Sequence, residues 1–76
     1  QLGEKATFKN GSGTFPINQT TFTVTDAFVT VNTLITVIPK TEKNGTWSVV
    51  SNNGNFVITS DSIETVAVSF DWAGVK

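Results

Sequence analysis

The sequence contains no cysteine, no histidine and no methionine among its 76 residues. Disulfide bonds and metal sites built from thiolate or imidazole ligands are therefore excluded. Without His or Cys, a hydrolase-type pair of nucleophile and base cannot be assembled, and carboxylates remain as the acid–base groups. A chain this short has little room for a cleft with two carboxylates across it. We therefore expect no catalytic residue, no metal ligand and no cofactor.

Positive charge is also sparse and is not concentrated anywhere. The formal net charge is −1, and the five basic residues are scattered lysines. Binding of nucleic acid depends on phosphate neutralisation, so this pattern disfavours it. No apolar run approaches the ~20 residues that span a bilayer, and no signal-peptide pattern opens the chain. We expect neither a nucleic-acid partner nor membrane insertion.

The length of 76 residues allows one domain. A domain of this size buries only about 60% of the surface of its unfolded chain, which makes it marginal when alone. With disulfides excluded, oligomerisation is the remaining common way to stabilise a small scaffold. Because the chain begins with Gln1 and not Met, we expect residues 1–5 to be a lead-in from an upstream segment and residues 6–76 to form a single β-sandwich domain.

Short strand-like stretches alternate with turn signals along the whole chain. Threonine, asparagine, valine and serine dominate, a composition that favours strands and turns. Turns that contain Asn are expected at residues 10–13 and 18–20, and hairpin turns at residues 44–45 and 52–54. Such spacing predicts an all-β fold: a small, jelly-roll-like antiparallel β-sandwich of about six to eight short strands. The expected strands are residues 6–9, 14–17, 21–25, 29–39, 46–51, 55–60 and 65–73.

The expected strand at residues 29–39 is the longest apolar, β-branched run. Within it, Leu34 and Ile38 belong to one alternating set and Ile35 and Val37 to the other, so both faces are apolar. A strand that is apolar on both faces needs cover on both. The chain can build only one core, and we expect a second copy to cover the other face. The candidate interface residues are Phe28, Leu34, Ile35, Val37 and Ile38, with the choice of face left open.

Aromatic residues fall in step with apolar neighbours on the expected strands. In the closing strand, Val66, Val68, Phe70 and Trp72 share one face, and in the first strand Ala6 and Phe8 do so. We expect an intra-subunit core that contains Trp47, Phe56, Ile58, Phe70 and Trp72. The alternative is that Trp47 and Trp72 are exposed platforms for stacking against sugar rings. Phe28 is equally compatible with a core position and with an inter-subunit contact.

Two acidic residues, Asp61 and Glu64, lie in one expected turn. We interpret them as turn and cap residues, with at most one helical turn between them. The alternative is a calcium site, which would need six or more oxygen ligands. Since these acids are expected at the surface, their desolvation and the shifts of their pKa should be small.

Loops on a rigid scaffold commonly carry binding function. Two polar loops are candidates here, and their side chains suit hydroxyl-rich glycans. The candidate surface-binding residues are Lys40, Lys43, Asn44, Asn52, Asn53 and Asn55.

Several stretches together resemble a known family. They are residues 6–8 with the following Gly-rich segment, residues 26–39 (DAFVTVNTLITVIP), residues 45–49 (GTWSV), residues 55–60 (NFVITS) and residues 66–72 (VAVSFDW). Their order resembles that of small β modules at the C-termini of bacteriophage tail fibres, tailspikes and other virion appendages. Ile38 stands before Pro39 where that family often has Thr.

The resemblance implies a compact homotrimeric β-sandwich on the virion surface or tail. Its expected function is non-enzymatic: it trimerises a phage fibre, spike or decoration protein and presents loops to a host surface. The expected partners are two further copies of the chain and a host cell-surface glycan. The alternative is a monomeric carbohydrate-binding module of a secreted, extracellular bacterial protein.

Overall fold

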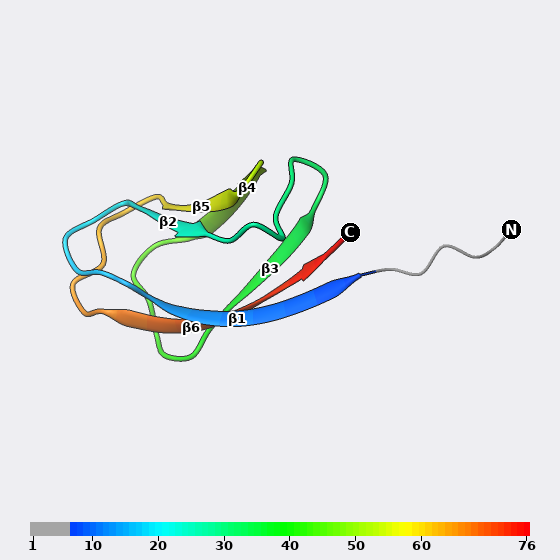
Figure 1. Ribbon diagram of the computed structural model, residues 1–76. Helices are drawn as coiled ribbons and strands as arrows, with labels where there is room; N and C mark the ends of the chain where they lie inside the picture. Colours follow the sequence, from blue (N-terminus) through cyan, green and yellow to red (C-terminus); the bar gives the residue numbers. More distant parts are fainter. Residues whose placement is uncertain (1–6) are drawn as a thin grey trace, which may run out of the picture.

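The computed structural model describes residues 7–76, which form six strands in two three-stranded sheets (Figure 1). Neighbouring strands are antiparallel throughout, with the order β1–β6–β3 in sheet A and β2–β5–β4 in sheet B. No helix occurs within residues 7–76, so the all-β prediction is confirmed. The expected lead-in at 1–5 and Ala6 lie outside the described residues. The strands are β1 (Phe8–Phe15), β2 (Thr21–Thr25), β3 (Leu34–Pro39), β4 (Trp47–Asn52), β5 (Asn55–Ser60) and β6 (Val68–Val75).

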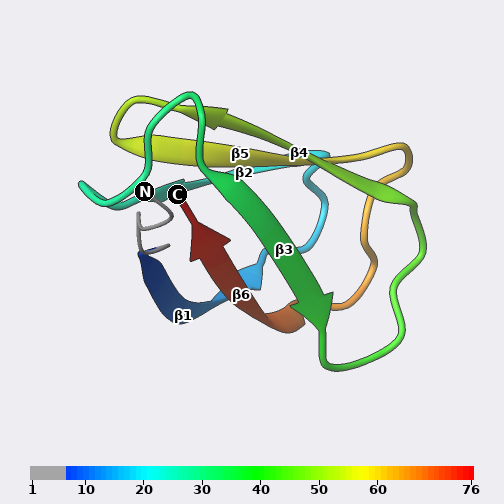
Figure 2. The ribbon, with the colours of Figure 1, turned by 90° about the vertical axis from the view of Figure 1, so that its right-hand side faces the viewer.

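The core lies between the two sheets, which form the two layers of Figure 2. Alternate residues of β5 and β6 point inward and are buried, as strand geometry requires. Trp47 is half-buried against this cluster and stacks on Phe15 with ring centroids 4.8 Å apart. The predicted core is thus confirmed, and Phe15 and Val29 join it. The buried hydrophobic residues are Phe15, Val29, Phe56, Ile58, Val68, Phe70 and Trp72.

The first strand differs from the prediction, because residues 10–13 form no turn and β1 runs through them. Gly11 and Gly13 lie directly opposite Trp72 and Phe70 on β6. A Cβ atom on Gly11 would lie 2.5 Å from Trp72 Nε1, and one on Gly13 would lie 2.8 Å from Phe70 Cζ. These glycines therefore make room for two aromatic rings inside the sandwich. Phe8, expected only to share a face with Ala6, is 68% exposed.

The apolar run at 29–39 forms a shorter strand than expected. Only Leu34–Pro39 is strand, and Val29 is a buried loop residue. Thr30 and Thr33 close a turn before it, since the Thr30 amide donates to Thr33 Oγ1 at 2.8 Å and the Thr33 amide to the Thr30 carbonyl at 3.0 Å. These local bonds satisfy the backbone without a partner strand.

Of the two expected hairpins, the structure contains one. The turn between β4 and β5 is confirmed, and Gly54 adopts a positive φ of 90° there. The hairpin expected at 44–45 is wrong, because β3 and β4 belong to different sheets and residues 40–46 cross between them.

The closing strand begins at Val68 and not at residue 65. Residues 61–67 cross from sheet B to sheet A before β6 starts. Val66, expected on the inward face, lies in that connection and is 68% exposed.

Candidate functional site

The side chain of Glu64 is buried at the end of the sandwich where residues 40–46 and 61–67 cross between the sheets. It is only 1% exposed. Its carboxylate accepts hydrogen bonds from the amides of Asn44 at 2.6 Å and Gly45 at 3.1 Å. Trp47 Nε1 donates to it at 3.0 Å and Ser60 Oγ at 3.2 Å. One acidic side chain thus joins both crossing segments to the start of β4 and the end of β5.

Burial has the largest single influence on the pKa of Glu64 and would raise it. The four hydrogen bonds together outweigh burial, and the pKa is lowered from its ordinary value of 4.5. The expectation of slight desolvation is therefore wrong for this residue. The segment around Asp61 and Glu64 contains no helical turn. Within residues 7–76, no group of three or more acidic side chains is placed to hold a metal ion.

Two of the predicted binding residues near Glu64, Lys43 and Asn44, make hydrogen bonds within the two crossing segments. Lys43 Nζ donates to the Gly45 carbonyl at 2.6 Å and lies 5.6 Å from the centre of the Trp47 ring. Asn44 Nδ2 donates to Thr65 Oγ1 at 2.9 Å and to the Ile63 carbonyl at 3.3 Å. Only Lys40, of the three predicted in this loop, extends away from it.

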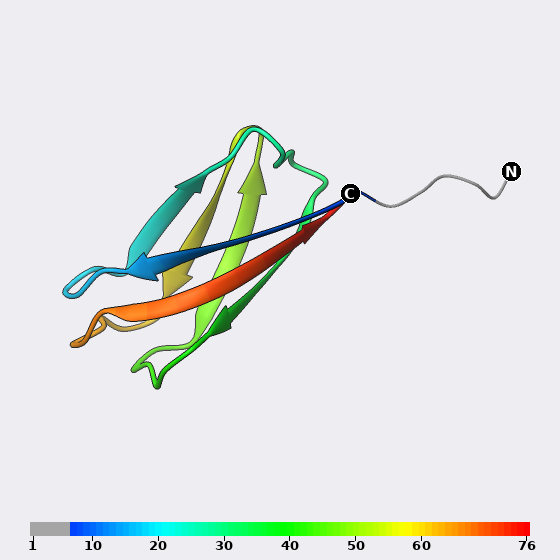
Figure 3. The ribbon, with the colours of Figure 1, turned by 60° about the horizontal axis from the view of Figure 1, so that its bottom comes forward.

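The second predicted loop lies at the other end of β4, as Figure 3 shows. Asn52 Nδ2 donates to Asn55 Oδ1 at 3.1 Å, and Asn53 Oδ1 accepts from the Val31 amide at 3.2 Å. These side chains fix the hairpin and dock residues 30–33 against it. The structure therefore does not bring the two predicted binding loops together.

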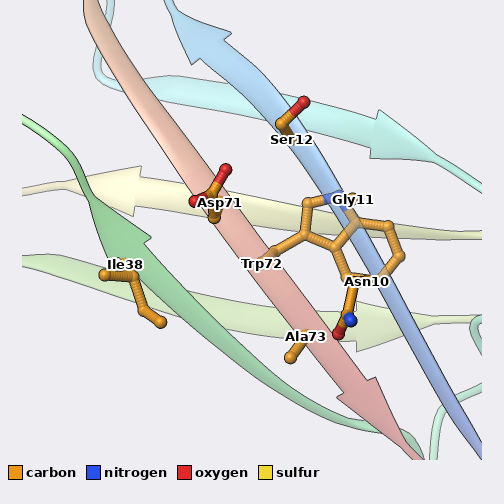
Figure 4. Close-up of a pocket in the computed structure, with 7 residues that line it drawn as sticks. All are labelled: Asn10, Gly11, Ser12, Ile38, Asp71, Trp72 and Ala73. Carbon is orange, nitrogen blue, oxygen red and sulfur yellow. The ribbon is translucent and has the colours of Figure 1, made fainter.

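The outer face of sheet A carries a shallow depression of about 420 Å³ (Figure 4). Asp71 and Ala73 stand on β6, Ile38 on β3, and Asn10 and Ser12 on β1. Lys40 Nζ lies 3.5 Å from Asp71 Oδ1, and both side chains are about half exposed.

The two tryptophans differ in exposure, with Trp72 buried and Trp47 partly exposed. Trp72 is 4% exposed, and its indole lies against Gly11 beneath the depression. Trp47 is half-buried, with one ring face against Phe15 and its Nε1 bonded to Glu64. The indole rings belong to the core of this chain, as the alternation of their strands predicted.

The structure separates the five predicted interface residues into two groups. Phe28, Ile35 and Val37 pack against the core cluster. Leu34 is 73% exposed and Ile38 is 55% exposed, and both stand on the outer face of sheet A.

Comparisons with protein-family models, with curated proteins and with solved structures gave no match to this chain. Among the described residues, no helix has the length and apolar character needed to cross a bilayer.

The role of Glu64 and the exposure of Phe8 were not predicted from the sequence. The residues around Glu64 gave no sign that its side chain is buried. Its apolar neighbours Ile63 and Val66 are themselves 49% and 68% exposed, so the apolar character of this segment does not mark burial. For Phe8 a signal was present: Gly11 and Gly13 lie two residues apart, matching the spacing of Phe70 and Trp72. Read as one strand, residues 8–15 would have placed Phe8 and Phe15 on opposite faces.

Proposed function

We propose that this chain is a non-enzymatic module that joins copies of itself at the tip of a virion appendage such as a phage fibre, spike or decoration protein. The observation that carries the proposal is the outer face of sheet A, where Leu34 and Ile38 remain exposed after one core has been completed. A domain of this size gains stability when such side chains are covered. The number of copies, three, and the virion location come from the resemblance of the sequence to fibre-tip modules.

A host cell-surface glycan is the second proposed partner. Three copies would present the same weak site three times, so that avidity replaces strong binding at any one site. Of the predicted loop residues, Asn53 is exposed on the hairpin between β4 and β5 of sheet B, away from the outer face of sheet A.

The alternative is a monomeric carbohydrate-binding module. One observation favours it: the depression of Figure 4 places Asn10, Ser12 and Asp71 around the apolar side chains of Ile38 and Ala73. Hydroxyl and carboxylate groups beside an apolar surface are suited to a sugar. Against it, of the two indoles that would stack on a pyranose, Trp72 lies in the core and Trp47 is half-buried against it.

The test is the mass of the chain in solution together with its melting temperature over a 100-fold range of concentration. The proposal predicts a trimer by light scattering and a melting temperature that rises with concentration through mass action. A monomer at every concentration, with a fixed melting temperature, would contradict it. Glycan-array binding by such a monomer would establish the alternative.

A further inference from the structure

The strand register brings three apolar side chains into one row across the outer face of sheet A. Phe8 on β1 and Leu34 on β3 both lie opposite Val75 on the central strand β6. Phe8 is 68% exposed and Leu34 is 73% exposed. Ile38 stands farther along the same face, opposite Asp71, with Thr36 and Ala73 between it and the row. We call Phe8, Leu34, Ile38 and Val75 the apolar patch.

We propose that the apolar patch is the surface through which copies of this chain associate. This inference rests on the proposed self-associating function and specifies the face that carries it. It also assigns the two alternating sets of apolar side chains between Leu34 and Ile38. Leu34 and Ile38 face the partner, while Ile35 and Val37 face the core of their own subunit.

The charge distribution favours a second copy over other partners. Asp71 is the one charged residue at the outward positions of sheet A, and Lys40 lies 3.5 Å from it. Lys9 turns away from this face to Asp26, with Nζ 2.8 Å from Oδ2. Identical surfaces can therefore meet without like charges opposing each other, which would be unfavourable. A strongly charged partner would find no complementary charge here.

The size of the patch also fits this role. From their exposed fractions, Phe8 and Leu34 in the row and Ile38 farther along the face together leave on the order of 350 Å² in contact with water, similar to the largest apolar patch on a typical monomer, which is often functional. A stable interface buries about 800 Å² on each partner, with an apolar centre and a polar rim. The patch supplies that centre, and the outward side chains around it supply the rim: Asn10, Ser12, Thr36 and Asp71.

The position of the patch is compatible with assembly along a fibre. Thr7 and Lys76 exchange two backbone hydrogen bonds, of 2.8 and 3.0 Å, beside the row of Phe8, Val75 and Leu34. When copies pack side by side in the same direction through the patch, their Thr7 residues lie at the same end of the assembly.

The test compares two charge substitutions of exposed apolar residues on opposite faces. Leu34→Glu changes the patch, and Val50→Glu changes the outer face of sheet B, where Val50 is 59% exposed. Analytical ultracentrifugation gives the association constant of each variant, and near-ultraviolet circular dichroism of the two indoles, Trp72 buried and Trp47 half-buried, reports folding. We expect Leu34→Glu to weaken association at least 100-fold with an unchanged spectrum, and Val50→Glu to leave association within threefold of the parent chain.

Each other outcome has a definite meaning. If Leu34→Glu disturbs the spectrum, Leu34→Thr replaces it, because Thr suits an exposed strand position and still removes the apolar side chain. If the parent chain associates and both Leu34 variants keep its association constant, or if Val50→Glu alone dissociates it, the assigned face is wrong while the proposed function stands. If the parent chain is monomeric at millimolar concentration, the proposed function and the inference both fail.

Discussion

The two outer faces of the sandwich are alike in charge and different in solvation. Sheet B presents no charged side chain at its outward positions, and sheet A presents Asp71 alone. On sheet B every cross-strand row contains a hydroxyl or amide group that can bond to water. On sheet A the row of Phe8, Val75 and Leu34 contains none. The outward residues of sheet B are Thr21, Thr23, Thr25, Ser48, Val50, Asn52, Asn55, Val57 and Thr59.

This comparison shows that low charge alone does not mark an interface. A face of threonine, serine and asparagine remains well hydrated without ions, and its Val50 and Val57 lie opposite each other beside Thr23. The face with Phe8 and Leu34 on either side of Val75 has no such groups in that row. The difference lies in the amount of contiguous apolar surface, which is the property that commonly distinguishes sites of association.

The largest expected effect comes from removing an aromatic ring beneath either face. Phe70 lies under sheet A and Phe56 under sheet B, and both are fully buried. We expect Phe70→Ala and Phe56→Ala each to lower the free energy of unfolding by about 3–5 kcal/mol. Urea unfolding followed by tryptophan fluorescence and by far-ultraviolet circular dichroism measures the loss.

Since both rings belong to one core, the two probes should give one coincident transition in both variants. As a control, Val50→Thr on the outer face of sheet B should change stability by no more than about 0.5 kcal/mol. Separate transitions for the two probes would mean that the two sheets unfold independently and that the single core described above is wrong.

The next effect concerns Glu64, whose carboxylate links the two segments that cross between the sheets, residues 40–46 and 61–67. The lowered pKa means that Glu64 contributes stability above its ordinary value of 4.5, and that this contribution is lost as pH falls through the lower folded value. Glu64→Gln places an amide donor among donors from Asn44, Gly45 and Trp47. We expect this variant to be destabilised at pH 7 and to lose less stability than the parent chain between pH 7 and pH 3.

Asp61 provides the matched control for Glu64. It lies in the same connection, is exposed, and accepts one backbone hydrogen bond, from the Thr46 amide at 2.9 Å. Asp61→Asn should therefore destabilise the chain less than Glu64→Gln at pH 7. Thermal unfolding at several pH values measures both effects. Equal effects of the two substitutions would show that burial of Glu64 adds nothing to the stability of the crossing segments.

The all-β class and much of the strand pattern could be predicted from sequence, because alternation is local. Residues 21–25 and 55–60 are strands with the predicted bounds, and their inward residues follow from a period of two. The Asn-rich turn at 52–54 could likewise be predicted from its own residues.

The failures come from partners distant in the sequence. Gly11 and Gly13 have the composition of a turn, and only the rings opposite them, about sixty residues later, explain a strand there. The Glu64 carboxylate binds Asn44 and Gly45, which lie 20 and 19 residues earlier. For the run from Leu34 to Ile38, both alternating sets are apolar, so its pattern had no means of showing which set enters the core.

The smallest expected effect concerns the one ion pair on the outer face of sheet A, between Lys40 and Asp71. Their atoms are 3.5 Å apart and both side chains are about half exposed, so a double-mutant cycle with Lys40→Ala and Asp71→Ala should give a coupling energy below about 1 kcal/mol. Because Lys40→Ala leaves Asp71 unpaired at the edge of the apolar patch, this variant should also weaken self-association slightly in low salt. The effect should disappear at 1 M salt, where the Debye length is about 3 Å. The double variant has no charged residue left at the outward positions of sheet A, so its association should be almost independent of salt. Sedimentation at low and high salt measures this, and a strong salt dependence that persists in the double variant would show that charges outside sheet A take part in the interface.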